Sequence, residues 1–248
     1  MISLSDRLQM IADEIKTGET MADIGTDHGF LPIYLLQKNI SPFVIMGDIS
    51  APTLEKTKEN VKINLEDYAA DSSEEVYCSC RVGNGFEILS PGEVDSVVIA
   101  GMGAAEMCDI IGKNPKKSVS FSKMILQPRK DVGLLRYFLC NNGFTVVREN
   151  LVRERKYICE ILTIKPGKDN LFIKKMRDVD KNSIKWEIPY YYRDFVINGD
   201  TLAIELIKRK ISREKMIINS KSNSNNADDS QNRENIKYLE RILGKYEI

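Results

Sequence analysis

Apolar and polar positions alternate along the first two thirds of the chain in a repeated strand-then-helix order. Short apolar runs typical of buried strands each end at a glycine or a polar residue, and a segment with helical spacing follows most of them. The runs predict strands at residues 20–24, 43–47, 76–82, 94–100 and 121–126, and a closing pair at 144–152 and 156–164. Five strand–helix units followed by a hairpin predict a doubly wound α/β sheet.

Helical spacing between these strands predicts the covering layers. Helices are expected at residues 3–17, 30–37, from 50 to about 68, from about 104 to 111, and at 130–141. In the first of them, Ser3 and Asp6 match a capping-box pattern. Pro32 lies in the first turn of the second, where a missing N–H costs little.

The last third of the chain has a different pattern. A helix is expected at 200–218, where isoleucines follow heptad spacing and Glu214 interrupts one seam position. The polar residues 219–232 predict a mobile linker, and a last helix carries Leu239 and Leu243. These two helices are expected to pair as an antiparallel coiled coil. We therefore predict a Rossmann-like domain at residues 1–165 and a helical coiled-coil domain at 166–248.

The charges balance overall, at 36 basic and 36 acidic side chains, but not locally. Residues 1–165 carry 19 basic and 23 acidic side chains, whereas residues 166–248 carry 17 and 13, which favours the second part as the one that approaches phosphates. One run between Asp109 and Asp131 contains no acidic residue. Its six basic residues form either a solvated face or a phosphate-contacting rim: Lys113, Lys116, Lys117, Lys123, Arg129 and Lys130.

The five cysteines are odd in number and have no zinc-site spacing. Cys78 and Cys80 are expected on one face of a strand, as packed thiols rather than ligands. No apolar run reaches the length of about 18 residues that a membrane span needs, and no signal peptide is evident, so a reducing cytosol is expected.

Four residues or turns lie at the ends of predicted strands. Right-handed crossovers bring the carboxyl ends of parallel strands to one edge of the sheet, where ligands bind. Gly25, Asp48, Asn84 and Gly101 all follow strands in this way. The four positions together predict a ligand site at that edge.

The most informative of these positions is the turn Asp23-x-Gly25-x-Asp27-x-Gly29. Its glycines let the chain turn sharply and approach a ligand closely, and the turn opens a helix. A carboxylate at position 27 would repel the pyrophosphate of a dinucleotide but suits a ligand with a sulfonium and an ammonium group. The turn therefore favours S-adenosylmethionine over NAD. A third possibility is that the turn binds no ligand.

Two further positions fit the same ligand. Asp48 stands 23 residues after Gly25, where an acidic residue can accept hydrogen bonds from both ribose hydroxyls. Asn84 can pair with an adenine edge through its amide, or it is an ordinary turn residue between two glycines.

The chain resembles the bacterial tRNA (adenine(22)-N(1))-methyltransferases. The matching segments are residues 4–8, 22–32, 83–85, 99–103 and 125–128. The Asp-His pair after the first glycine and the Ala-Gly-Met-Gly sequence are the most specific of them. The resemblance covers most of residues 1–165, and the coiled-coil tail resembles the family's second domain.

The chain also departs from that family. Thr26 stands in place of Ser, Gly29-Phe30 in place of Ala-Tyr, and Asp48 in place of Glu. Asn84 replaces an Asp, and Arg129 replaces a frequent Asn after Gln-Pro, which puts the placement of the substrate in question.

The resemblance implies a Rossmann-like class I S-adenosylmethionine-dependent methyltransferase that methylates N1 of adenine 22 in tRNA. It implies tRNA as partner, no membrane or metal, a cytoplasmic location, and a monomer or weak oligomer. Asp27 is the catalytic candidate, either stabilising charge on the base or holding its amino group, unless it only caps the helix. The cofactor candidates are Asp23, Gly25, Thr26, His28, Asp48, Ile49, Asn84, Gly85, Gly101 and Met102.

Other functions stay open from the sequence alone. His28, the single histidine, either contacts cofactor or substrate or is a packed or capping residue. The alternatives for the whole chain are a methyltransferase acting on another substrate, a non-catalytic RNA-binding protein that kept the fold, and a nicotinamide dehydrogenase.

Overall fold

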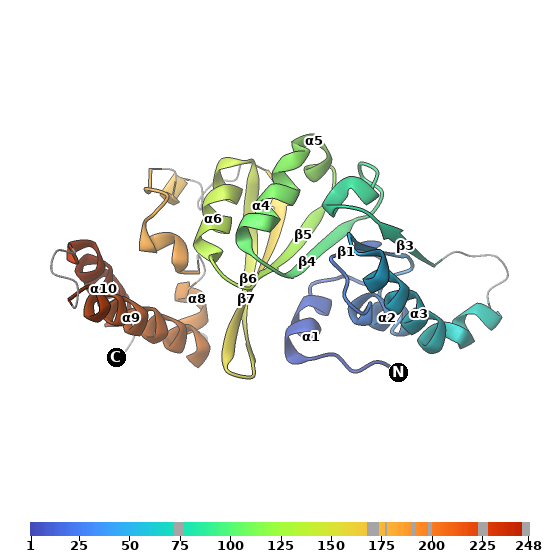
Figure 1. Cartoon of the computed structure of the whole chain (residues 1–248), viewed down its shortest axis with the longest axis horizontal. Helices are drawn as coiled ribbons and strands as arrows, with labels where there is room; N and C mark the ends of the chain where they lie inside the picture. Colours follow the sequence, from blue (N-terminus) through green and yellow to red (C-terminus); the bar gives the residue numbers. More distant parts are fainter. Residues whose placement is uncertain are drawn as a thin grey trace. The chain divides into compact units, whose positions relative to one another are not determined.

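The computed structural model describes residues 1–71, 77–167, 174–176, 178–189, 192–197, 200–222 and 228–244 (Figure 1). Contacts between residues divide the chain into two compact units, Met1–Lys181 and Asn182–Ile248. This division falls later than the change of composition at residue 165. We describe each unit by itself.

The first unit is built on a seven-stranded sheet of order β3-β2-β1-β4-β5-β7-β6. Its strands are β1 (Met21–Ile24), β2 (Val44–Asp48), β3 (Cys78–Val82), β4 (Ser96–Met102), β5 (Lys123–Pro128), β6 (Phe144–Glu154) and β7 (Tyr157–Pro166). β1 to β5 are parallel, and β7 runs antiparallel to both β5 and β6. The strand order reverses between β1 and β4, which makes the carboxyl ends of these two strands the topological switch point.

Helices cover both faces of this sheet, as Figure 1 shows. One layer consists of α1 (Asp6–Ala12), α2 (Phe30–Gln37) and α3 (Ala51–Asp71), which contact one another in sequence order. The other contains α4 (Ala104–Lys113), α5 (Pro115–Ser118) and α6 (Val132–Asn141). Because both faces are covered, the central strands are mostly apolar, and Val97, Val98 and Ile99 of β4 are fully buried. The predicted α/β class is confirmed.

Two short elements and one helix start differ from the expectations. Helix α1 begins at Asp6, and the Ser5 side chain accepts a hydrogen bond from Leu8 N. The predicted capping box of Ser3 and Asp6 is therefore wrong, because the N-cap is Ser5, two residues later, and the helix is shorter. The 3₁₀ turn η1 (Gly85–Ile88) and helix α5 were not predicted, since each is only four residues long.

The second unit consists of η2 (Ile184–Glu187), α8 (Tyr192–Ile197), α9 (Thr201–Ser222) and α10 (Ser230–Leu243). Contacts of Lys215 with Glu240 and of Lys221 with Asn232 show that α9 and α10 pack antiparallel, as predicted. Glu214 is buried between them and accepts hydrogen bonds from Asn232 and Asn235. A polar residue satisfied in this way fixes the register of a helix pair.

The predicted linker at residues 219–232 is wrong at both ends. Helix α9 continues to Ser222 and α10 already begins at Ser230. The middle of the predicted linker, residues 223–227, lies outside the described residues.

Candidate active site

The turn between β1 and α2 is held against the neighbouring strand by its backbone. Gly25 N and Thr26 N both donate to the Gly47 carbonyl, at 2.8 and 3.0 Å. Gly25 has φ +78°, and a Cβ atom there would lie 2.1 Å from Cε of Met102. The positive φ favours glycine here, and a side chain would displace the end of Met102.

Asp23 lies beneath this turn, at the end of β1. Burial raises the pKa of the Asp23 carboxyl to about 6, and Asp48 adds to the rise, whereas the Thr26 hydroxyl and Arg7 oppose it. A carboxylate that is poorly compensated inside the protein is stabilised by a cationic ligand. The turn therefore combines close backbone approach with a preference for positive charge.

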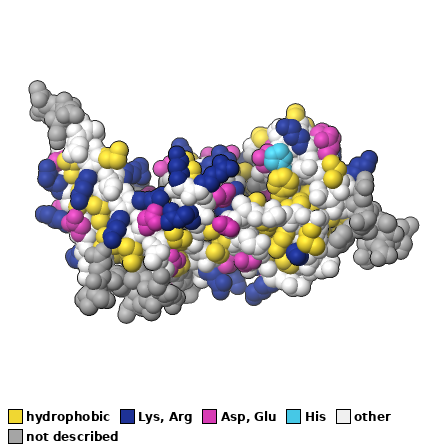
Figure 2. Space-filling view, turned by 90° about the horizontal axis from the view of Figure 1, so that it is seen from below, with side chains coloured by type: hydrophobic (Ala, Val, Ile, Leu, Met, Phe, Trp, Pro, Cys, Tyr) yellow, Lys and Arg dark blue, Asp and Glu magenta, His cyan; other side chains and the backbone are white. Residues whose placement is uncertain are grey.

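Asp27 and His28 occupy the outer part of the turn. The Asp27 side chain is 81% exposed, and its Oδ2 lies 3.5 Å from Nε2 of His28. The His28 ring stacks on Phe30, with 5.3 Å between ring centroids. In Figure 2 the histidine, coloured cyan, lies at the surface beside acidic and apolar side chains. Asp27 is therefore accessible to a substrate from solvent.

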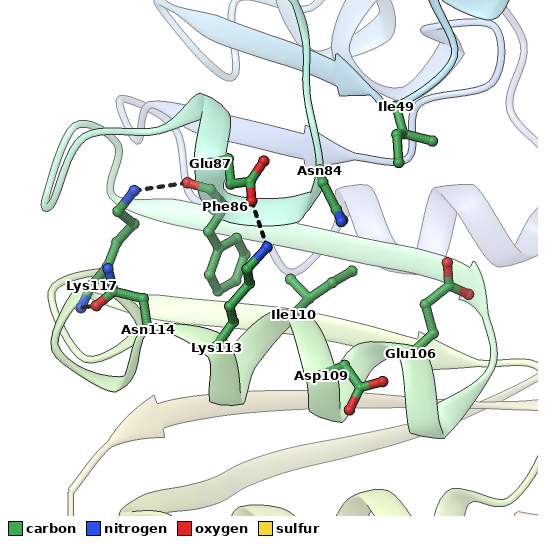
Figure 3. Close-up of a pocket in the computed structure, with 10 residues that line it drawn as sticks. All are labelled: Ile49, Asn84, Phe86, Glu87, Glu106, Asp109, Ile110, Lys113, Asn114 and Lys117. Atoms are coloured by element: carbon green, nitrogen blue, oxygen red, sulfur yellow. Dashed lines mark hydrogen bonds and ion pairs between the residues drawn. The ribbon is translucent and has the colours of Figure 1, made fainter.

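The ends of β2 and β3 meet a cavity of about 580 Å³. Ile49 and Asn84 point toward it from the β2 and β3 ends, and Glu106 and Ile110 of α4 form the facing wall (Figure 3). Of the predicted cofactor residues, the cavity lining thus brings together Ile49 and Asn84. The cavity is large enough for a purine with part of its sugar.

Two residues adjoin the lining residues Asn84 and Ile49 in the sequence and shape this edge of the sheet. Gly85 has φ +56°, and a Cβ atom there would lie 2.9 Å from Cγ2 of Ile110, so a side chain would close the gap. Asp48 is half-buried, and its Oδ1 accepts a hydrogen bond from Ser50 N at 2.7 Å. This bond orients the carboxylate and leaves Oδ2 for a ligand.

A hydrogen-bonded network supports the end of β4 from below. Oε1 of the buried Gln127 accepts from Gly101 N at 3.2 Å and from Nη1 of Arg7 at 3.1 Å. Arg7 is held in turn by Glu154, at 2.6 Å. The pairing of β4 with β5 shifts register between Ala100 and Met102, and Gly101 has φ +76°. Gln127 therefore holds the backbone of Gly101 where the pairing of β4 with β5 is irregular. We call residues Gly101–Gly103 the Gly101–Gly103 loop.

Sequence reasoning did not assign site roles to Arg7, Gln127, Glu106 or Ile110. Arg7 and Gln127 lie in segments that carry the family resemblance, which was the one available signal for them. Glu106 and Ile110 follow the helical spacing of α4 and match no motif.

The basic run at 113–130 does not form one continuous rim. Lys113 pairs with Glu87, Lys117 donates to the Phe86 carbonyl at 2.9 Å, and Lys123 is buried in an ion pair with Glu19 at the opposite end of the sheet. A solvated or phosphate-facing role is thus left to the remaining members of the run.

Cys78 and Cys80 are partly buried against the core of the sheet, and burial raises the pKa of both thiols. Within the described ranges, no three His, Cys, Asp or Glu side chains are grouped so as to hold a metal ion. The described helices include none long and apolar enough to cross a membrane.

The sequence of the chain is similar to known methyltransferases. Residues 4–162 match the family model described as "Methyltransferase domain". The chain is 31% identical over 167 residues to the tRNA (adenine(22)-N(1))-methyltransferase of Bacillus subtilis, a match that covers 67% of this chain and 66% of that protein. The match thus spans about two thirds of that relative's length.

Solved structures agree with the fold over nearly the whole chain. A protein of the NADB-Rossmann superfamily from Streptococcus agalactiae superimposes with TM-score 0.79 at 25% identity, covering 98% of both chains. A putative tRNA (m1A22) methyltransferase from Streptococcus pneumoniae, in complex with S-adenosyl-L-methionine, gives TM-score 0.76 at 21% identity and covers 98% of this chain and 100% of that one. At that identity the second likeness shows the fold alone. These structures agree with the predicted fold, and the Bacillus subtilis relative agrees with the family resemblance drawn from the sequence.

Proposed function

Because the chain belongs to the methyltransferase-domain family, we propose that it transfers the methyl group of S-adenosylmethionine to N1 of adenine 22 in tRNA. The observation that carries this proposal is the partly buried Asp23 carboxylate beneath the Gly25 turn, at the same edge of the sheet as a cavity that accommodates a purine. Family membership narrows the ligand to a methyl donor, and the curated relative narrows the acceptor to tRNA. The cytosol is the proposed location.

The residues at this edge fit the cofactor part by part. Ile49, Asn84 and Ile110 would hold the adenine in the cavity, and the free oxygen of Asp48 would accept from the ribose. The Gly25 turn admits the methionine part, because no side chain stands between the backbone and the ligand. Asp23 would compensate its positive charge. When bound, S-adenosylmethionine supplies a methyl group activated by its sulfonium.

The chain's own residues then have to position the base rather than remove a proton. Adenine N1 carries a free lone pair, so no strong general base is required, and alignment can lower the barrier by several kcal/mol. The exposed Asp27 carboxylate stabilises the positive charge that develops on the ring or holds its amino group. The Gly101–Gly103 loop, fixed by Gln127, forms the wall against which the base rests.

A target adenine in a helix must first leave its base pair, because N1 lies on the pairing edge. The chain would hold the rest of the tRNA by shape and phosphates. The helical unit at the C-terminus is the proposed holding surface, since residues 166–248 carry more basic than acidic side chains.

A nucleoside-resolved methylation assay tests the proposal. Purified protein is incubated with a tRNA transcript and methyl-labelled cofactor, and the digested nucleosides are separated by mass spectrometry. We expect label in 1-methyladenosine, lost when adenine 22 is replaced by guanine and kept when another adenine is replaced. Label in another nucleoside, or tight tRNA binding without transfer, would overturn the proposed reaction.

A further inference from the structure

Some basic residues of the run at 113–130 have hydrogen-bond or ion-pair partners within the protein, and others do not. Lys113, Lys117 and Lys123 each have a partner, as described above. For the side chains of Lys116, Arg129 and Lys130, the described part of the chain offers no hydrogen bond or ion pair. All three are exposed. These three cations are therefore available to an external anion.

Two of the three stand at the candidate active site. Arg129 N donates to the Met102 carbonyl at 2.8 Å, which ties the end of β5 to the end of β4. Nε and Nη2 of Arg129 both lie 3.8 Å from the position of a Cβ atom on Gly101, and Cε of Lys130 lies 4.0 Å from that on Gly103. Both side chains thus lie against the glycine loop whose Met102 contacts the Gly25 turn.

The backbone keeps them in that place. Asp131 follows directly with φ 56° at the N-cap position of α6, so the chain turns away immediately after Lys130. Lys116, by contrast, lies in α5, beyond the end of α4 that is remote from the loop. The three free cations therefore divide into a pair at the site and one away from it.

The charges around the pair favour an anion at Arg129 and Lys130. Five other charged side chains at this edge are acidic, whereas the two lysines of the cavity lining, Lys113 and Lys117, already have partners within the protein. The acidic residues are Asp23, Asp27, Asp48, Glu106 and Asp109. An approaching polyanion is repelled by them. A guanidinium also offers the planar pair of donors that matches a phosphate.

We infer that Arg129 and Lys130 bind a backbone phosphate of the RNA next to the target adenine, so that this pair positions the substrate strand over the Gly101–Gly103 loop. The inference rests on the proposed function, because it takes tRNA as the substrate. It makes Arg129 a contact for the nucleic acid and not for the cofactor.

The test compares Arg129→Gln, the double variant Arg129→Gln/Lys130→Gln, and the matched control Lys116→Gln, which removes a free cation of the same run. Fluorescence anisotropy gives the tRNA Kd from about 50 to 200 mM salt, and calorimetry gives the Kd for S-adenosylhomocysteine. We expect Arg129→Gln to weaken tRNA binding about fivefold at low salt and to reduce the salt slope by about one. The double variant should reduce the salt slope further. The Kd for S-adenosylhomocysteine and the melting temperature should be unchanged in both variants.

Each other outcome has a meaning. An unchanged salt slope in both site variants, or an equal reduction in Lys116→Gln, overturns the inference. A weaker S-adenosylhomocysteine Kd with unchanged tRNA binding also overturns it and assigns Arg129 to the cofactor carboxylate. Because the readout is binding, a wild-type protein that binds tRNA without methylating it would refute the proposed function and leave the inference to be decided by the slopes.

Discussion

The charged side chains at the two ends of the parallel sheet differ in whether they have partners within the protein. At the amino ends of β1, β4 and β5, Nζ of Lys123 lies 2.6 Å from Oε2 of Glu19 and donates to the Glu14 carbonyl. Ser96 Oγ donates to the same Glu19 oxygen, at 3.0 Å. Thr20 donates from both its N and its Oγ1 to Asp95. This end satisfies its polar groups internally.

At the carboxyl ends of β1 and of its neighbour β2 the charges have few internal partners. Asp27 is exposed, Asp48 keeps one oxygen free, and the pKa of Asp23 is raised by burial. Because both ends belong to one sheet and β1 contributes to each, neither composition nor secondary structure explains the difference. The comparison indicates that one end of the sheet stabilises the fold and the other is kept ready for ligands. Three substitutions test this division.

The largest effect is expected at the amino end, from Lys123→Met. The variant leaves the Glu19 carboxylate without its cation, and breaking one side of a buried pair costs about 3 kcal/mol of unfolding free energy. Burial raises the pKa of Glu19, but Lys123, the Lys16 amide and Ser96 bring it below its ordinary value. The stabilisation is therefore present at neutral pH and is lost as the pH falls through the folded-state pKa. Urea unfolding at pH 7 measures the loss.

The double variant Lys123→Met/Glu19→Gln serves as control, since removing both charges should recover part of that stability. The melting shift caused by S-adenosylhomocysteine should stay the same in both variants. A weaker ligand in Lys123→Met would show that the two ends are not independent.

The next effect is expected at the carboxyl end, from Asp27→Ala. We expect kcat to fall about 100-fold, because a charge that stabilises the transition state is removed. Since the side chain is exposed, the unfolding free energy should change by less than about 0.5 kcal/mol. Single-turnover methylation of tRNA measures the loss of rate, and urea unfolding measures the free energy of unfolding. Calorimetry with S-adenosylhomocysteine checks that the cofactor site is intact.

Asp27→Asn separates the charge from the hydrogen bond. An equally slow Asn variant assigns the effect to charge, and a nearly active one assigns it to holding the adenine amino group. Full turnover by Asp27→Ala would remove Asp27 from the mechanism.

Local signals explain which parts of this picture were predictable. Helix α2 begins and ends at the predicted residues 30 and 37, because a glycine turn and Pro32 mark its start. The crossover rule then brought Gly25, Asp48 and Asn84 to one edge without any knowledge of contacts. The helix capped by Ser5 shows the limit of such signals, since Ser3, Ser5 and Asp6 offer competing starts within four residues.

Tertiary contacts explain what the sequence could not reveal. Arg7 and Gln127 are 120 residues apart, and only the packing of α1 near the end of β5 brings them together. The pairing of the run's lysines with Glu87, Phe86 and Glu19 was equally invisible, so the run resembled one surface. The polar stretch at 219–232 predicted a linker by composition, but packing of α9 against α10 extends helix into it.

The smallest effect concerns Asp23, where the expected change lies in pH dependence. With a pKa of about 6, the Asp23 carboxyl of the free protein is mostly protonated at pH 5 and ionised at pH 8. A cationic ligand binds the ionised form, so affinity for S-adenosylmethionine should be about tenfold weaker at pH 5 than at pH 8. Asp23→Asn should bind weakly at both values. Asp13→Asn is the control, because this exposed residue adjoins Glu14 at the amino end of the sheet.

The unfolding free energy of the ligand-free protein should fall as the pH rises, whereas the affinity for the cofactor should increase. This contrast distinguishes a role in ligand binding from a role in stabilising the fold. A carboxyl whose pKa is raised on folding destabilises the fold above that pKa, and the cost disappears as the pH falls toward 4. Asp23→Asn should therefore be more stable than the wild type at pH 8 although it binds the cofactor less well. A variant that is both less stable and less able to bind at pH 8 would show that Asp23 serves the fold, and the contrast between the two ends of the sheet would then fail at its central residue.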